Sequence, residues 1–423
     1  MVKYDSYKES GVEWIGEIPS NWKTPRLKHH ITISFGGEVI DKSFWGDGDE
    51  ILYTTSKKIH KSDFKGFNDE RRTTDSDLLL SRNGDGIVHI PDNGSIYTNV
   101  VQLIRIKNGV DRRFLWYTLT SQIKPLNSFS DGDFIVSLNK EQWFNLLTPL
   151  PLFNEQQQIV EFLDIKTSLI DSLVEKTQRK IKLLKEQRTS LINHTVTKGL
   201  NPNIELKDSG VEWIGEVPIH WNITPLKILG NFQNGISKGS EFFGHGFPFM
   251  NYGDVYKNDI TPFQVEGKVE SDEVERERYS ILRGDVFFTR TSESKDDIGV
   301  SSVCLKTISQ CVFSGFVIRF RFYNKIQTPE YSRYHFQTHW KKVFIESRMN
   351  IVTRSSLSQQ VLGQVPVLIP PLSEQQQIVE FLDKKTNLID TTISREQKRI
   401  ELLKEYRQSL ISNVVTGKIK VCD

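Results

Sequence analysis

The chain has 423 residues, of which 37% are hydrophobic and 26% charged, and its formal net charge is +2. This length is sufficient for two or three domains with cores of their own. No run of 18 apolar residues occurs, so no transmembrane helix is expected, and the first residues lack the apolar region of a signal peptide. The three cysteines have neither metal-ligand nor disulfide spacing, which favours reduced thiols and a cytoplasmic location.

The charge is balanced within each half of the chain as well. Residues 23–152 carry 17 basic and 16 acidic side chains, and residues 222–371 carry 18 and 15. Nucleic-acid-binding proteins often show a clear basic excess. Any nucleic-acid interface of this chain must therefore come from local patches.

A tryptophan-containing segment opens the chain and returns later. Residues 10–22 read Ser-Gly-Val-Glu-Trp-Ile-Gly-Glu-Ile-Pro-Ser-Asn-Trp, and residues 209–221 repeat them closely. The glycines and prolines predict a turn-rich segment whose tryptophans pack against a neighbouring element. Stacking of the tryptophans on bases is the functional alternative.

The block that follows has the pattern of a mixed α/β domain. Apolar runs predict strands at 50–53, 78–80, 86–90 and 100–106, and a short helix at 114–121. Residues 222–371 repeat this outline loosely: 285–290 aligns with 77–82, 311–322 with 96–106, and 331–340 with the short helix. The two blocks share an outline and differ in almost every detail.

Each block is followed by a long helical segment. The ten residues Glu-Gln-Gln-Gln-Ile-Val-Glu-Phe-Leu-Asp occur at 155–164 and again, unchanged, at 374–383. Asn154 and Ser373 precede them as predicted N-caps of capping boxes. Glycines predict the helix ends near residues 199 and 417. The chain is thus an internal duplication, which suggests pseudo-twofold symmetry.

The two helical segments carry matching heptad patterns of apolar residues. An apolar stripe of this kind, which we call the seam, extends over about 60 Å of helix and favours packing against a partner helix. The other copy is the nearest candidate for that partner. We therefore predict an antiparallel coiled coil; a single amphipathic helix packed on a core is the alternative. The predicted seam comprises Leu163, Ile170, Val174, Ile181, Leu184 and Leu191 in the first copy, and Leu382, Ile389, Ile393, Ile400, Leu403 and Leu410 in the second.

Motifs of catalysis are absent from the sequence. It contains no phosphate-binding loop, no dinucleotide fingerprint, no base-gripping tetrad of an adenine methyltransferase and no zinc-ligand spacing. Asp259, Glu266 and Lys268 faintly resemble the metal site of some nucleases, which leaves a metal-dependent nuclease as one alternative. A coiled-coil scaffold that binds other proteins is a second alternative.

The remaining polar residues form an inventory suited to reading DNA. Arginine, asparagine, serine and threonine contact base edges in the major groove, and lysine or arginine pairs bind phosphates. Many of them follow predicted strand ends, although any single member could be a solvated surface charge. The candidates are Lys57, Lys58, Arg71, Arg72, Arg82, Asn83, Asn251, Tyr252, Arg290, Thr291, Ser292, Asn350 and Arg354. Two DNA-binding domains with different side chains, joined by a symmetric spacer, would contact two different half-sites of a gapped sequence.

At this point the chain resembles a known family, the specificity subunits of type I restriction-modification systems. The resemblance rests on the repeated entry to the helices at 151–164 and 370–383 and on the repeated tryptophan segment, and it covers the whole chain. The first copy departs from the pattern by having one proline fewer before its helix. The family's base-contacting residues follow no motif, so none can be carried over.

The resemblance implies an α+β fold with two target recognition domains, separated by an antiparallel coiled coil of two long helices. The expected parts are a first recognition domain (1–152), a central spacer helix (153–200), a second recognition domain (201–371) and a C-terminal spacer helix (372–423). The implied function is non-catalytic recognition of double-stranded DNA. Two methyltransferase (modification) subunits and restriction/translocase subunits are the implied partners, and they would bind S-adenosylmethionine, ATP and Mg²⁺. The chain itself would need no cofactor.

Overall fold

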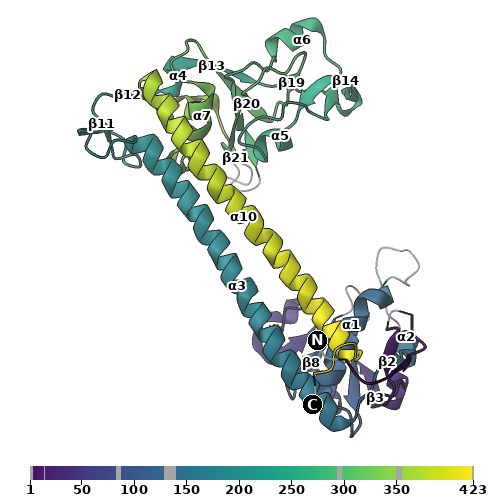
Figure 1. Cartoon of the computed structure of the whole chain (residues 1–423). Helices are drawn as coiled ribbons and strands as arrows, with labels where there is room; N and C mark the ends of the chain where they lie inside the picture. The colour runs from purple at the N-terminus through teal and green to yellow at the C-terminus, as the bar shows by residue number, and fades with distance from the viewer. Residues whose placement is uncertain are drawn as a thin grey trace. The chain divides into compact units, whose positions relative to one another are not determined.

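The computed structural model describes residues 3–13, 15–81, 87–127, 140–292, 298–348 and 355–421. The chain divides into two compact units (Figure 1). The first unit comprises residues 1–178 and 397–423, and the second comprises residues 179–396. We call residues 23–152 the first domain and residues 222–371 the second domain.

The first unit begins with an antiparallel hairpin and continues into two sheets. The hairpin is formed by β1 (Tyr7–Glu9) and β2 (Glu17–Pro19), so the turn-rich segment supplies its turn and its second strand. One sheet has the order β3-β9-β6-β7 and the other has the order β5-β4-β8. The elements are β3 (Ile31–Gly36), β4 (Trp45–Tyr53), β5 (His60–Ser62), β6 (Asp77–Ser81), β7 (Val88–His89), β8 (Ile96–Tyr97), β9 (Val101–Ile106), α1 (Arg112–Asn127) and α2 (Lys140–Asn145).

The second unit repeats the hairpin and the two main sheets of the first, and also contains the strand pairs β12–β22 and β17–β21. Its hairpin is β10–β11, and its two main sheets have the orders β13-β20-β16-β18 and β15-β14-β19, which match those of the first unit. The elements are β10 (Leu206–Asp208), β11 (Glu216–Pro218), β12 (Asn222–Pro225), α4 (Leu226–Leu229), β13 (Gly230–Asn234), β14 (Phe243–Met250), α5 (Tyr252–Tyr256), β15 (Lys268–Val269), α6 (Glu273–Arg278), β16 (Val286–Thr289), β17 (Thr291–Ser292), β18 (Ser301–Val303), β19 (Val312–Phe313), β20 (Val317–Phe322), α7 (Pro329–His335), α8 (His339–Ser347), β21 (Ser355–Ser356), α9 (Gln359–Gly363) and β22 (Pro366–Ile369).

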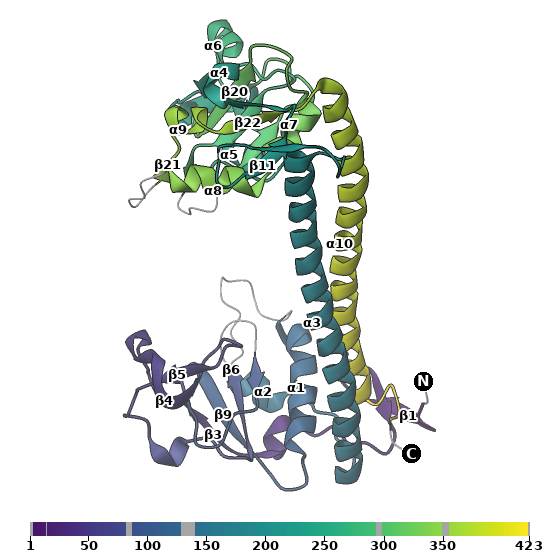
Figure 2. The same ribbon diagram turned by 90° about the vertical axis from the view of Figure 1, so that its left-hand side faces the viewer.

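The central strand of each domain is buried on both faces. In β6, Leu78 and Leu80 belong to a core with α1, whereas Leu79 belongs to a core with β4 and β8. Because side chains alternate along a strand, the middle residues of a strand covered on both sides are consecutively apolar. Figure 2 shows α1 beside this sheet in the first unit. In β16, Phe287 and Phe288 divide between two cores in the same way.

Two long helices contribute to both units: α3 (Phe153–Lys198) and α10 (Leu372–Val415). In the first unit, Arg407 of α10 forms an ion pair with Asp171 of α3 at 2.9 Å. The second unit contains the pair that corresponds to it in the duplication, Arg188 with Asp390, also at 2.9 Å. Lys180 pairs there with Glu396 at 2.6 Å. Higher numbers in α3 meet lower numbers in α10, so the helices run antiparallel within this unit.

The predicted capping boxes are wrong, whereas the predicted helix ends are confirmed. The helices already include residues 153 and 372, so Asn154 and Ser373 lie inside the first turn. The side chain of Gln376 bonds to Glu380 instead of capping the helix. At the other ends, Gly199 and Gly417 both have φ of 73°, the left-handed conformation that terminates a helix.

The twelve predicted seam residues are all buried or partly buried. Leu163, Ile170 and Leu410 belong to one core of the first unit, and Leu382 belongs to the main core of the second. Leucines outside the pattern, such as Leu169 and Leu388, are exposed instead. The heptad pattern thus identifies the buried face of each helix.

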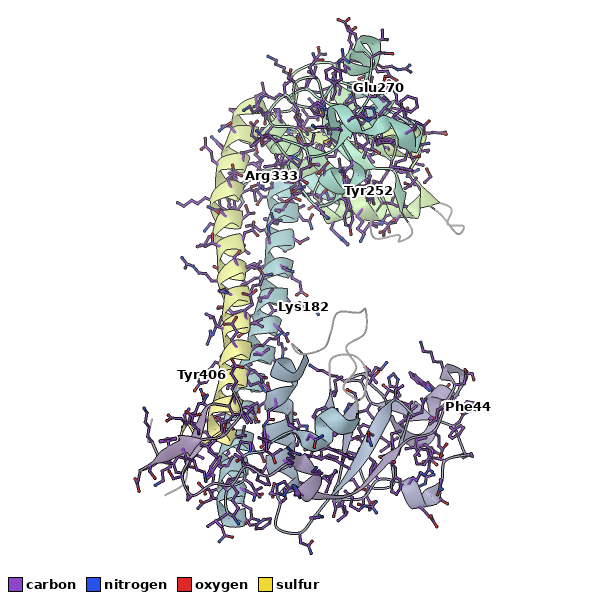
Figure 3. The ribbon with its side chains drawn as sticks, turned by 90° about the vertical axis from the view of Figure 1, so that its right-hand side faces the viewer. Phe44, Lys182, Tyr252, Glu270, Arg333 and Tyr406 are labelled. Atoms are coloured by element: carbon purple, nitrogen blue, oxygen red, sulfur yellow. The ribbon has the colours of Figure 1, made fainter. Side chains whose placement is uncertain are left out.

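Both ends of the unchanged ten-residue repeat form contacts that attach the tryptophan segment and the domain of each unit to its helix. The indole Nε1 of Trp22 donates to Glu155 at 3.1 Å, and that of Trp221 donates to Glu374 at 3.1 Å. At the other end of the repeat, Tyr334 donates to Asp383 at 2.6 Å. The matching contact of the first unit joins Tyr117 to Asp164 at 2.8 Å. Figure 3 shows Arg333 next to α10, and its guanidinium lies 3.5 Å from Asp383.

Candidate nucleic-acid interface

Several strand ends of the first domain meet at one edge. Strands β4 and β8 run parallel and end together at Tyr53 and Tyr97, and β6 ends at Ser81 opposite the start of β9. The chain that leaves β3 joins them: the N–H of Gly37 donates to Val101 O at 3.3 Å. The N–H of Thr98 donates to Tyr53 O at 3.1 Å. We call the residues that follow these strand ends the strand-end surface of the first domain.

The second domain builds the same edge with the same hydrogen bonds. Strands β14 and β19 end together at Met250 and Phe313, and β16 ends at Thr289 opposite Val317. The N–H of Gly235 donates to Val317 O at 3.3 Å, and that of Ser314 donates to Met250 O at 3.0 Å. The strand-end surface of the second domain comprises Asn234, Asn251, Arg290, Thr291, Ser314, Gly315 and Phe316.

One glycine in each domain allows these strand ends to approach. A Cβ atom at Gly37 would lie 2.0 Å from the carbonyl oxygen of Tyr97, and one at Gly235 would lie 2.2 Å from that of Phe313. No other residue fits such a distance without a shift of backbone. The two domains therefore share one backbone frame at these strand ends, while the side chains that project from it differ between them.

Arg290 lies on the strand-end surface of the second domain. Its backbone N–H donates to Phe316 O at 2.9 Å, its carbonyl accepts from the N–H of Leu357 at 2.7 Å, and its Nη1 lies 3.4 Å from Gly315 O. Thr291 starts β17, which pairs with β21 through Ser356. Figures 1 and 2 show β21 and α5 at the same end of the domain. The side chain of Ser292, and Asn350 and Arg354 altogether, lie outside what the structure describes.

Asn251 and Tyr252 follow β14 directly and open α5. The Oδ1 atom of Asn251 accepts from the N–H of Asp254 at 3.2 Å, and Asp254 completes the capping box by accepting from the N–H of Asn251. The cap uses one lone pair of the oxygen that would accept a hydrogen bond from adenine. Tyr252, labelled in Figure 3, stacks on Tyr256 with ring centroids 5.8 Å apart. Asn251 is exposed on the strand-end surface, but part of its hydrogen-bonding capacity is already used.

The candidates of the first domain fall into two groups. Lys57 and Lys58 follow the end of β4 on the strand-end surface; both are exposed, and neither forms an ion pair with a described residue. Arg82 and Asn83 lie outside the described residues. Arg71 is half-exposed, 3.3 Å from the carboxylate of Glu38.

Arg72 differs from these candidates because its guanidinium is held within the domain. It contacts Glu50 at 2.7 and 3.1 Å, Asp69 at 2.8 Å and the carbonyl of Gly94 at 2.8 Å. The hydrogen bonds to Glu50 and Asp69 raise the pKa of Arg72 above its ordinary value. The observed contacts are structural, and a role in DNA binding stays a prediction.

Sequence reasoning missed several residues of the strand-end surfaces, including Asn234, Phe316 and Val39. Asn234 ends β13, and Phe316 follows the turn between β19 and β20 with 62% of its surface exposed. In the first domain Val39 is 77% exposed next to Glu38, which pairs with Thr98. The signal for Phe316 was present in the sequence: a Ser-Gly-Phe turn between two apolar runs.

Two features of the described residues concern the alternative functions. Among the described ranges of the chain, no group of three or more His, Cys, Asp or Glu side chains is arranged to hold a metal ion. The carboxylate of Asp259 instead lies 3.6 Å from Arg188. Within the same described ranges, no helix is long and apolar enough to span a membrane.

Comparison with known proteins gives a consistent result. A family model described as the type I restriction modification DNA specificity domain matches residues 19–183 and again residues 220–403. The specificity subunit of the type I restriction enzyme MjaVIII from Methanocaldococcus jannaschii is 25% identical over 96% of this chain and 94% of its own length. That of EcoKI from Escherichia coli is 24% identical over 70% of this chain and 62% of its own length.

Solved structures show the same fold. A chain from a structure of a type I restriction-modification system, titled for its complex assembly and conformational transition, aligns with a TM-score of 0.71 at 15% identity, over 95% of this chain and 99% of that one. The HsdS subunit from Thermoanaerobacter tengcongensis aligns with a TM-score of 0.51 at 16% identity, over 95% and 98%. The protein therefore belongs to the type I restriction-modification DNA specificity family, and it is a specificity subunit with two copies of the recognition domain.

Proposed function

We propose that the chain recognises an asymmetric, bipartite DNA sequence with a gap, and that each strand-end surface contacts one half-site in the major groove. The observation that supports this most directly is the repetition of one backbone frame with different side chains. At equivalent positions of this frame, the second domain has Gly315 and Phe316, whereas the first has Asn99 and Val100. A shared backbone frame would let both domains dock on DNA in the same way, and different side chains would select different bases.

The long helices are proposed to act as the spacer between the half-sites. Helix α3 has 46 residues and α10 has 44, which corresponds to about 65–70 Å of helix. Half-sites read from one face of B-DNA lie roughly 34 Å apart, or a multiple of that distance. Ion pairs related by the duplication, Arg407 with Asp171 and Arg188 with Asp390, support an antiparallel coiled coil.

The proposed role of the chain is recognition without catalysis. It directs adenine-N6 methylation and restriction that partner subunits perform. Two methyltransferase subunits dock on the spacer, and restriction/translocase subunits complete the assembly. S-adenosylmethionine, ATP and Mg²⁺ belong to these partners. The symmetry of the duplication supports two equivalent docking positions, one for each half-site.

The test is a salt titration of DNA binding by the chain assembled with its methyltransferase subunits. A protein that neutralises six to ten phosphates loses roughly 10³- to 10⁵-fold in affinity between 50 and 200 mM salt. We expect a steep loss of affinity on a duplex that carries the target, and weaker binding to a shuffled duplex at every salt concentration. Binding to neither duplex at low salt would favour a scaffold for other proteins. Cleavage by the purified chain with Mg²⁺ alone would favour the nuclease.

A further inference from the structure

Phe316 occupies an unusual position on the strand-end surface of the second domain. Single exposed apolar side chains are common, so exposure alone assigns no role. However, this ring is 62% exposed at the residue that directly follows the Ser314–Gly315 turn, next to Arg290. The place of the ring relative to the arginine is what suggests a function.

The backbone around Phe316 is held from several sides. Its carbonyl accepts from the N–H of Arg290 at 2.9 Å, and its own N–H donates to Ser314 Oγ at 3.3 Å. The N–H of the preceding Gly315 donates to Ile236 O at 2.8 Å. A Cβ atom at Gly315 would lie 2.3 Å from Ser237 Oγ, so the turn is closely packed. A ring that projects from a fixed backbone can be placed reproducibly against a ligand.

Arg290 and Phe316 lie opposite each other across an antiparallel pair, continuing the register of Thr289 with Val317. Residues paired in this way are about 5 Å apart. Successive base pairs are separated by ~3.4 Å along the helix axis. The two side chains can therefore contact the same base pair or neighbouring ones, provided that the surface faces the major groove.

The chemistry of the pair then indicates what each side chain reads. Arginine donates to the O6 and N7 atoms of guanine, and apolar side chains contact the C5 methyl group of thymine, the apolar group that marks T·A pairs in the major groove. We infer that Phe316 packs against a thymine methyl group in the second half-site, within one or two base pairs of a guanine read by Arg290. This inference rests on the proposed function and deepens it.

The first domain has no aromatic ring at the position that corresponds to Phe316. The residue that corresponds to Phe316 is Val100, which is only half-buried, and Gly315 is replaced by Asn99. Removal of the ring should therefore change the second half-site and leave the first half-site unaffected.

The test uses the chain assembled with its methyltransferase subunits and duplexes in which each thymine of the second half-site is replaced in turn by deoxyuridine, which lacks the methyl group. Burial of one methyl group corresponds to about fourfold in affinity. We expect the unaltered complex to lose about three- to fivefold at one position, and Phe316→Ala to bind both duplexes equally. Phe316→Leu should keep part of the discrimination, because it retains an apolar side chain.

Tyr323→Ala is the matched control. Tyr323 is 66% exposed and lies just after the other end of β20, about 20 Å from Phe316. This variant should discriminate as the unaltered complex does. The inference is overturned if Phe316→Ala keeps the sensitivity to deoxyuridine, or if the unaltered complex shows none in the second half-site. A complex that binds no duplex specifically refutes the proposed function instead, and the inference with it.

Discussion

Arg290 offers the sharpest test that each domain recognises its own half-site, because its guanidinium forms one long hydrogen bond and no ion pair with the described residues. Within the described part of the chain, its Nη1 donates to Gly315 O at 3.4 Å, which is a long hydrogen bond. Arg290→Ala should therefore leave the thermal stability of the chain nearly unchanged. If Arg290 pairs with a guanine, its loss should cost about 1–3 kcal/mol, which is roughly 5- to 150-fold in affinity.

The assay is competition binding by the assembled complex against duplexes with every single-base change in both half-sites. Arg290→Ala should lose discrimination at one position of the second half-site and keep the full pattern of the first. Equal loss of discrimination in both half-sites would refute the idea of separate readers. Loss of affinity with unchanged discrimination would show that Arg290 contacts phosphate.

Arg72→Ala is the matched comparison, because the residue type is the same and the surroundings differ. The guanidinium of Arg72 is partly buried and holds Glu50, Asp69 and the carbonyl of Gly94 together. Its removal should destabilise the first domain by about 2–3 kcal/mol, measured by chemical denaturation. An unchanged unfolding midpoint combined with weakened DNA binding would contradict the structural role and return Arg72 to the DNA-binding candidates.

Three further predictions concern the second unit and are measured by its unfolding. Asp285 is 1% exposed and holds Arg321 at 2.6 Å, so Asp285→Ala should cost about 3–5 kcal/mol by leaving a cation unpaired; a loss below 1 kcal/mol would contradict this. Glu374→Ala removes the acceptor of the Trp221 indole and should cost about 1–3 kcal/mol, whereas Glu374→Gln, which keeps an acceptor, should cost less. Burial lowers the pKa of His335 to about 3, so below pH 6.5 the unfolded chain binds a proton that the folded chain excludes. Between pH 6.5 and about pH 3, the free energy of unfolding should fall by about 1.4 kcal/mol for each unit by which the pH is lowered. His335→Phe should lessen that slope.

Much of the architecture could be predicted because it rests on repeated or periodic patterns. The heptad positions identified the buried faces of α3 and α10. The alignment of residues 285–290 with 77–82 correctly identified β16 as the counterpart of β6 in the other unit. The N-caps were misplaced because the pattern does not distinguish a cap from a first-turn residue. The repeated segment around Trp22 was expected to be rich in turns; it forms the turn and second strand of a hairpin whose first strand, β1, precedes the repeat.

The recognition residues were harder to predict because their role depends on contacts between distant segments. Arg72 and Arg290 look alike in the sequence, and only the positions of Glu50 and Asp69 show that one of them is held inside its domain. Phe316 and Asn234 join the same surface from strands more than 80 residues apart. Their convergence follows from the strand order, which no local pattern of residues specifies.

The central claim is that this chain selects the sites at which partner subunits methylate DNA. The most direct measurement is a genome-wide map of N6-methyladenine in cells that carry the gene and in cells that lack it. We expect methylation to disappear at one gapped, two-part motif whose halves differ, and to return with the intact gene. An unchanged map in cells that express both the chain and a methyltransferase would contradict the claim.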